Sequence, residues 1–242
     1  MDLTVLGCAG SYGSPAGGAY SGYLVRAGGA AIWMDCGNGT FANLQRHIDP
    51  GDLDAVVITH AHPDHCVDIY GLHVLYRYGL QRSGLPVYAP EGVERRLATL
   101  VGEWGDAFTW AEVGDGDRVG VADASLRFAR TDHPLPTVAV ECTHGDRRLV
   151  YTADTGPAWS VEAFGPGADL VLSEASYLHD DIPAPIHLSA RQAGEAARAA
   201  AARRLVITHL WPMIDPVASV TEASEAFGRE VTLAAPHLAL RI

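Results

Sequence analysis

Four short apolar segments of the chain each end in a small hydroxyl residue that is followed within two positions by a His, Asp or Glu. With their terminal polar residue included, these segments are 56–60, 149–154, 170–174 and 205–209. A continuous apolar run of this length is typical of a strand that is buried on both faces. Buried strands that end in polar side chains carry those groups to an edge of the sheet on rigid elements, as a precise site requires. The pattern therefore predicts helix-covered sheets with an ionisable site at one edge.

The rest of the chain alternates between strand and helix patterns. Strands are predicted at 2–7, 21–26, 30–35, 54–59, 86–88, 168–173, 204–208 and 230–235, with mostly strand between 108 and 152. Helices are predicted near 39–48, 66–80, 91–103, 189–203 and 216–227. The helix at 189–203 is the clearest, because Ser189 and Gln192 fit a capping box and an Ala- and Arg-rich run follows. Strands mixed with helices in both halves indicate an α/β (α+β) fold of layered sheets.

The charge balance excludes some function classes. The chain has 17 basic and 29 acidic residues, a formal net charge of -12, which argues against broad binding of nucleic acid or of anionic membranes. No apolar run approaches the roughly 20 residues that span a membrane, and the first residues resemble a strand rather than a signal peptide. We therefore expect a cytoplasmic protein. Its cysteines, Cys8, Cys36, Cys66 and Cys142, form no metal-binding pair and are expected to be buried free thiols.

Residues 59–65 read Thr-His-Ala-His-Pro-Asp-His and place three imidazoles and a carboxylate within six positions. His and Asp are good ligands for zinc and similar divalent ions. In a tight loop after a strand, His60 and His62 can point to one ion while Asp64 and His65 point to another. The segment therefore predicts a site for two metal ions.

The H-x-H-x-D-H spacing of this loop resembles the signature of the metallo-β-lactamase superfamily. The segment 35–40 is similar to the Asp-Cys-Gly-x-Gly-Thr sequence of the ribonuclease Z-like branch. His133 before Pro134 resembles the third-histidine motif, and 151–155 resembles the Gly-Asp-Thr motif with Ala153 in place of Gly. The resemblance covers residues 3 to 209 and implies a four-layer αββα sandwich. Because both halves supply ligands, we expect 1–242 to form a single domain.

The resemblance also implies a role for each ligand. His60, His62 and His133 would bind the first metal ion, Asp64, His65 and His209 would bind the second, and Asp154 would bridge the two. Zinc is the expected metal, and Mn or Fe would also suit these donors.

Two further residues match motifs of ribonuclease Z-like enzymes. Glu174 lies in Ser-Glu-Ala-Ser and His187 in His-Leu-Ser-Ala, and the resemblance implies that they handle the proton of the leaving group beside the catalytic Asp64. Two interpretations in which these residues transfer no proton also stay open. Glu174 could orient a ligand without taking part in the chemistry, and His187 could merely precede a helix.

The resemblance is closest to actinobacterial metallo-hydrolases that include cyclic-nucleotide phosphodiesterases, which share the Leu-Gln-Arg-His segment at 44–47. It implies hydrolysis of small or cyclic phosphodiesters by a metal-bridging hydroxide. Only 20 residues separate His133 from Asp154, too few for the arm of ribonuclease Z, so tRNA is not expected as a substrate. The alternatives are an ester, thioester or lactone hydrolase and a ribonuclease Z-like RNA-processing nuclease. We expect no membrane partner, and a homodimer is among the assemblies that such proteins form.

Overall fold

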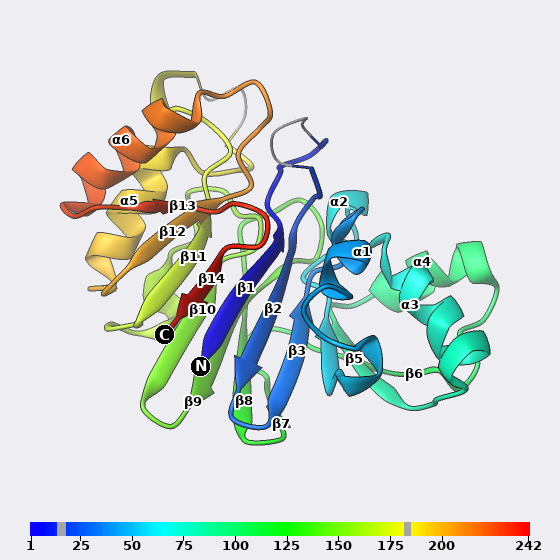
Figure 1. Ribbon diagram of the computed structural model, residues 1–242. Coiled ribbons are helices and arrows are strands. Elements are labelled where there is room, and N and C mark those ends of the chain that lie inside the picture. The colour runs from blue at the N-terminus through cyan, green and yellow to red at the C-terminus, as the bar shows by residue number, and fades with distance from the viewer. Residues whose placement is uncertain (14–17, 182–184) are drawn as a thin grey trace.

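Two sheets of seven strands face each other, and helices cover their outer faces (Figure 1). The computed structural model describes residues 1–13, 18–181 and 185–242. The strand order is β14-β1-β2-β3-β4-β5-β6 in the first sheet and β13-β12-β11-β10-β9-β8-β7 in the second. This arrangement is the αββα sandwich that the sequence predicts.

The first sheet contains β1 (Asp2–Gly7), β2 (Gly22–Ala27), β3 (Ala30–Met34), β4 (Ala55–Val57), β5 (Leu85–Ala89), β6 (Phe108–Glu112) and β14 (Ala239–Arg241). The second contains β7 (Arg118–Val121), β8 (Ala124–Arg130), β9 (Val138–His144), β10 (Arg147–Tyr151), β11 (Leu170–Glu174), β12 (Leu205–Thr208) and β13 (Thr232–Leu233). The α-helices are α1 (Thr40–Leu44), α2 (Pro63–Cys66), α3 (Ile69–Val74), α4 (Val93–Val101), α5 (Ala190–Ala199) and α6 (Pro216–Phe227). The shorter turns are η1 (Pro50–Asp52), η2 (Leu75–Leu80), η3 (Val161–Phe164) and η4 (His179–Asp181).

Three apolar cores correspond to the three interfaces between the layers. The central core lies between the sheets and contains Tyr23 from the first and Phe128 from the second. The second core packs the first sheet against α1 to α4 and contains Trp33. The third packs the second sheet against α5 and α6 and contains Val171. Strands β4, β11 and β12 are buried along their whole length, as their continuous apolar runs predict.

Within each sheet, four consecutive strands run parallel: β3 to β6 in the first and β10 to β13 in the second. The carboxyl ends of parallel strands meet at one edge, so polar residues after β4, β10, β11 and β12 converge there. The end of β4 also links the sheets, because Ile58 N donates to Tyr88 O of β5 while Val138 N of β9 donates to Thr59 O. The residue that follows, His60, is thereby held where the two sheets meet.

Several predicted boundaries are wrong. The predicted helix at 66–80 begins at Pro63, inside the metal-binding motif, and is divided into α2, α3 and the π-helical turn η2. The strand at 230–235 shortens to β13, and β14 was not predicted. His73, a histidine outside the predicted site for which a surface or boundary position is the default, is 5% exposed, because its ring packs on Trp104 and its Nε2 atom lies 3.0 Å from Trp104 O.

In the described part of the chain, no helix has the length and apolar character needed to cross a membrane.

Candidate metal centre

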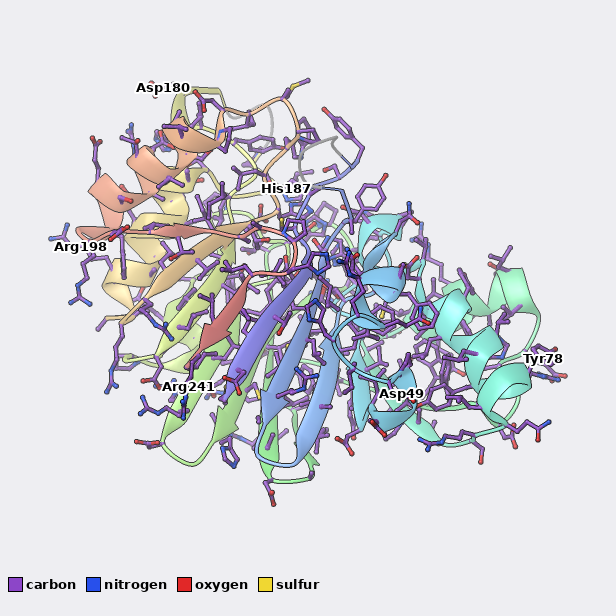
Figure 2. All side chains as sticks on the ribbon, viewed as in Figure 1. Asp49, Tyr78, Asp180, His187, Arg198 and Arg241 are labelled. Carbon is purple, nitrogen blue, oxygen red and sulfur yellow. The ribbon has the colours of Figure 1, made fainter. Side chains whose placement is uncertain are left out.

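All seven predicted metal ligands lie together at the edge where the two sheets meet. His60 follows β4, and His62, Asp64 and His65 belong to the first turn of α2 or its N-cap. The others follow β8, β10 and β12 and are His133, Asp154 and His209. His187, just before α5, lies at the same end of the molecule (Figure 2).

The first group of ligands surrounds His62 Nδ1. This atom lies 3.0 Å from His60 Nε2 and 3.3 Å from His133 Nε2. Asp154 Oδ2 completes the group at 3.5 Å from His60 Nε2. These four residues form one of the clusters that could hold a metal ion.

The second group surrounds His65 Nε2 and His209 Nε2, which lie 3.3 Å apart. Asp64 Oδ2 is 3.3 Å from His209 Nε2 and 3.6 Å from His65 Nε2. Asp154 Oδ1 is 3.3 Å from His65 Nε2 and 3.6 Å from His209 Nε2. Asp154 thus presents one carboxylate oxygen to each group, as a bridging ligand would.

These residues fit divalent ions. Four donors around a tetrahedral ion with bonds of 2.0–2.1 Å lie about 3.3–3.4 Å from one another, close to the separations in both groups. Asp154 Oδ1 is buried and accepts no hydrogen bond from the described residues, although two imidazole nitrogens are nearby. A buried carboxylate oxygen without a donor is costly unless a cation completes its surroundings.

Four of the histidines form a hydrogen bond through Nδ1, which leaves Nε2 free to bind a metal ion. Nδ1 of His60 lies 3.1 Å from Thr59 Oγ1, and Nδ1 of His133 lies 3.2 Å from Ile186 O. Nδ1 of His65 lies 2.8 Å from Asp35 Oδ2, and Nδ1 of His209 lies 3.0 Å from Ser176 Oγ. Each partner can accept from an Nδ1–H group, so in the neutral form of each ring the lone pair lies on Nε2, the atom that faces the expected metal position.

The pKa values of the first group keep its imidazoles neutral. Burial, reinforced by the nearby His60, lowers the pKa of His62 to about 4. Burial is also the main cause that lowers the pKa of His133 to about 4, and burial with the neighbouring His65 lowers the pKa of His60. Neutral imidazoles are the form that binds metal ions.

The second group has the opposite electrostatics. Burial alone would lower the pKa of His65, but the carboxylates of Asp154, Asp64 and Asp35 raise it well above its ordinary value. Burial would likewise raise the pKa of Asp64, but the imidazoles of His65 and His209 hold it below its ordinary value. Without metal, this group is a network of ion pairs whose proton a metal ion would replace.

Glu174 and His187 form a hydrogen-bonded pair next to the Asp154 carboxylate. His187 Nδ1 lies 3.1 Å from both carboxylate oxygens of Glu174 and 3.9 Å from Asp154 Oδ2. Burial opposes protonation of His187, but Glu174 and then Asp154 raise its pKa to about 9. Glu174 also accepts from Ser176 Oγ at 2.7 Å, and Ser176 Oγ contacts His209, so the pair is linked to a ligand of the second group.

Asp35 was not identified as a site residue in the sequence. It is fully buried, has a φ of 58° and accepts from Thr59 N, Thr59 Oγ1 and Tyr151 OH as well as lying against His65 Nδ1. The only sequence signal was its place in the segment 35–40, which resembles a family motif. Its contacts place this motif behind His65, one of the residues expected to bind metal.

Tyr12, Trp110, Trp159, Tyr177 and Trp211 are aromatic residues that could stack on a base or lie in the core or rim, and three of them form a row that leads away from His187. The Tyr177 ring lies 5.9 Å from that of His187 and 4.9 Å from that of Trp211, and Tyr12 lies 6.3 Å from Trp211. Trp110 instead packs against Trp104, at 5.2 Å. The fifth, Trp159, packs on Phe164 at 6.1 Å.

Sequence comparison identifies a family and several relatives. The family described as "Beta-lactamase superfamily domain" matches residues 31–210. A Mycobacterium leprae protein is 35% identical over 237 residues, covering 93% of this chain and 83% of that protein. The probable metallo-hydrolase YhfI of Bacillus subtilis is 32% identical over 216 residues, 87% of each chain. Ribonuclease Z of Haloarcula marismortui is 26% identical and covers all of this chain and 97% of its own.

Solved structures share the architecture. The crystal structure of the metallo-β-lactamase fold protein YhfI from Bacillus subtilis has a TM-score of 0.90 at 27% identity and covers 99% of both chains. The short form of human tRNase Z has a TM-score of 0.78 at 23% identity, covering 100% of this chain and 99% of that one. At 23% identity, the similarity to human tRNase Z shows a shared fold and nothing further.

Proposed function

The chain belongs to the metallo-β-lactamase superfamily, with a relationship to ribonuclease Z, and on this premise we propose that it is a hydrolase of small or cyclic phosphodiesters that uses two divalent metal ions. The observation that carries the proposal is the Glu174–His187 pair, held 3.9 Å from the bridging Asp154. Such a pair serves a reaction in which a poor leaving group needs a proton, as the alkoxide of a phosphodiester does.

The seven ligands would hold the ions, with Asp154 shared between them. Zinc suits these His and Asp donors best. Bound there, the ions would supply an activated water and neutralise charge on the phosphoryl oxygens. The chain's own contribution is to fix the neutral imidazoles of the first group, which the outer hydrogen bonds of His60 and His133 achieve.

His187 is the proposed proton donor. The Glu174 carboxylate accepts from Nδ1 and keeps the ring protonated at neutral pH, since the pKa of His187 is raised to about 9. None of the described residues accepts a hydrogen bond from Nε2, so this N–H is available to the leaving oxygen. Glu174 is itself fixed, because Oε1 accepts from Thr155 N. We therefore assign it the role of orienting and charging His187.

The surroundings of the site favour a small substrate over tRNA. The segment between His133 and Asp154 is the hairpin of β9 and β10, which leaves no room for an additional arm. The net charge of -12 opposes docking of a large polyanion.

The test is a parallel hydrolysis assay on metal-loaded protein. The panel contains bis-p-nitrophenyl phosphate, 3′,5′-cyclic AMP, a precursor tRNA, a thioester and a chromogenic β-lactam. We expect cleavage of the first two and its loss in Asp154→Ala, with His144→Ala, at the half-buried end of β9, as a control. Activity restricted to the thioester or the lactam would contradict the phosphodiesterase assignment.

The role of His187 needs a separate comparison of leaving groups. We expect His187→Ala to lose about 10²–10⁴-fold on an alkyl phosphodiester and much less on a p-nitrophenyl diester, whose phenolate leaves without a proton. A loss of similar size on both substrates would show that His187 has another role.

A further inference from the structure

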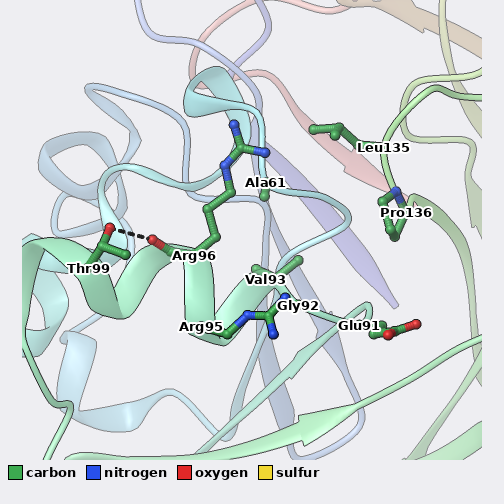
Figure 3. A pocket seen from close by; sticks show the side chains of 9 residues that line it. All are labelled: Ala61, Glu91, Gly92, Val93, Arg95, Arg96, Thr99, Leu135 and Pro136. Atoms are coloured by element: carbon green, nitrogen blue, oxygen red, sulfur yellow. Dashed lines mark hydrogen bonds between the residues drawn. The ribbon is translucent and has the colours of Figure 1, made fainter.

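A cavity of about 490 Å³ opens next to the first group of ligands (Figure 3). One wall is α4, with Arg95, Arg96 and Thr99, and the cavity also touches Ala61, Leu135 and Pro136. Ala61 lies between His60 and His62, and Leu135 is two positions after His133. Since consecutive Cα atoms are about 3.8 Å apart, Ala61 brings this end of the cavity close to the loop that carries His60 and His62.

The two arginines that line the cavity, Arg95 and Arg96, form no ion pair with the described residues. Both are exposed, and in the described part of the chain the arginines in ion pairs are others: Arg127, Arg147, Arg148, Arg191 and Arg203. Arg96 extends toward the loop that carries Ala61 (Figure 3). What sets Arg95 and Arg96 apart from other exposed arginines is that both line a cavity that also touches Ala61.

The other side chains of the cavity do not cancel this charge. Glu91 is the only carboxylate among its lining residues, and it lies on the far side near Pro136 (Figure 3). The Thr99 hydroxyl donates to Arg96 O at 2.7 Å (Figure 3) and so helps to fix the turn of α4 that presents Arg96. The wall formed by α4 therefore carries a local positive charge.

We propose that Arg95 and Arg96 bind a second anionic group of the substrate, a phosphate that is not itself cleaved. This inference rests on the proposed function, because the scissile phosphodiester would lie on the metal ions. Guanidinium groups bind phosphate through paired, charge-assisted hydrogen bonds. Among small phosphodiesters, the preferred substrate is then one with an additional terminal phosphate, such as a phosphorylated dinucleotide.

A matched pair of chromogenic substrates tests this selectivity. Thymidine 5′-(p-nitrophenyl phosphate) has only the scissile group, and its 3′-phosphorylated counterpart adds one phosphate. For the metal-loaded protein we expect kcat/KM to be about tenfold or more higher on the second compound, as hydrogen bonds between charged groups provide. In Arg95→Ala/Arg96→Ala this ratio should fall to about one, while kcat/KM on the first compound changes by less than about twofold.

A control variant separates local binding from overall charge. Arg198→Ala/Arg241→Ala removes the same two charges from exposed positions away from the cavity (Figure 2) and should keep the ratio. Glu91→Gln should raise the ratio, because it removes the one opposing charge of the cavity. A ratio of about one in the unchanged protein, or the same loss in both double variants, would overturn the inference.

A binding experiment distinguishes failure of this inference from failure of the proposed function. Isothermal titration of the metal-loaded protein compares adenosine 3′,5′-bisphosphate with adenosine 5′-monophosphate, neither of which is a diester. Tighter binding of the bisphosphate that is lost in Arg95→Ala/Arg96→Ala supports the phosphate site even if no diester is cleaved. Equal binding of the two nucleotides overturns the site even if diesters are cleaved.

Discussion

Asp35 Oδ2 lies 2.8 Å from His65 Nδ1, on the side of the imidazole opposite the Nε2 atom that faces Asp154. The same carboxylate oxygen accepts from Thr59 Oγ1 and Tyr151 OH, and Oδ1 accepts from Thr59 N. Asp35 therefore fixes both the direction of the His65 ring and the nitrogen that carries its proton. A carboxylate behind a ligating histidine also makes the imidazole a stronger donor to metal.

Asp35→Asn should weaken metal binding at the second group. The amide nitrogen can no longer accept all of these hydrogen bonds, so His65 loses its fixed orientation. We expect the affinity for the second ion to fall by about 10–100-fold while the first ion is retained. Competition with a chromogenic chelator measures both affinities.

Two other substitutions show whether this effect is specific. Tyr151→Phe removes one of the donors to Asp35 and should have a smaller effect. Asp169→Asn alters a buried carboxylate that pairs with Arg203 in another part of the fold, and it should lower stability without changing metal affinity. Undiminished binding of two ions by Asp35→Asn would disprove the orienting role.

Metal uptake should release protons at the second group only. At pH 7 His62 and His133 are already neutral, because burial lowers the pKa of each to about 4. His65 is protonated, because its carboxylate neighbours outweigh the effect of burial and raise its pKa well above the ordinary value. The folded protein must therefore lose a proton from His65 when a metal ion binds there, and the affinity for this ion should rise with pH until the pKa of His65 is passed.

The number of protons released on metal binding can be measured by calorimetry in buffers of different ionisation enthalpy. We expect about one proton to be released with one ion and almost none with the other between pH 6 and 8, so only one affinity should rise, by up to about tenfold per pH unit. Asp35→Asn should reduce the release, because it removes one of the carboxylates that raise the pKa of His65. Equal proton release with both ions would contradict the prediction.

The residues expected as ligands can be picked out from the sequence because they lie in local patterns, and the structure brings them together. His60, His62, Asp64 and His65 occur within one loop, and Asp154 and His209 follow strands whose continuous apolar runs are easily identified. Ala153 replaces the Gly of the family motif, and the structure gives it a φ of 53°, a left-handed conformation that favours glycine. The motif thus reflects a backbone requirement at the turn before the bridging ligand.

Other features depend on contacts that sequence periodicity does not reveal. The role of Asp35 depends on residues 24 to 116 positions away, Thr59 and Tyr151 among them. Strand β14 is three residues long and forms only by pairing with β1 at the other end of the chain. Arg95 and Arg96 belong to no sequence motif. They can be recognised as candidates only because the fold places them in the same cavity as Ala61.

The four cysteines should be unreactive in the folded protein. All are buried and free, as the sequence predicts. Burial raises the pKa of Cys8, Cys66 and Cys142 to about 12 and that of Cys36 well above its ordinary value. At pH 8 a thiol with a pKa of about 12 is about 10⁻⁴ thiolate, the reactive form. Ellman's reagent should therefore detect almost no thiol before guanidinium is added and four afterwards, and rapid labelling of the native protein would contradict this.

Gly10→Ala should disturb His209 specifically. A Cβ atom at this position would lie 2.4 Å from His209 O and 3.1 Å from His209 Nδ1, so the ligand or the loop must move. We expect a loss of about 1–3 kcal/mol in the free energy of unfolding, as overpacking produces, and weaker binding of the second ion. Gly120→Ala is the control, because its Cβ would have no heavy atom within 4 Å. Thermal unfolding with and without chelator measures both effects: the stabilisation by metal should shrink in Gly10→Ala and persist in Gly120→Ala. A Gly10→Ala protein as stable as the unchanged protein, with both ions bound, would show that the loop yields without moving His209.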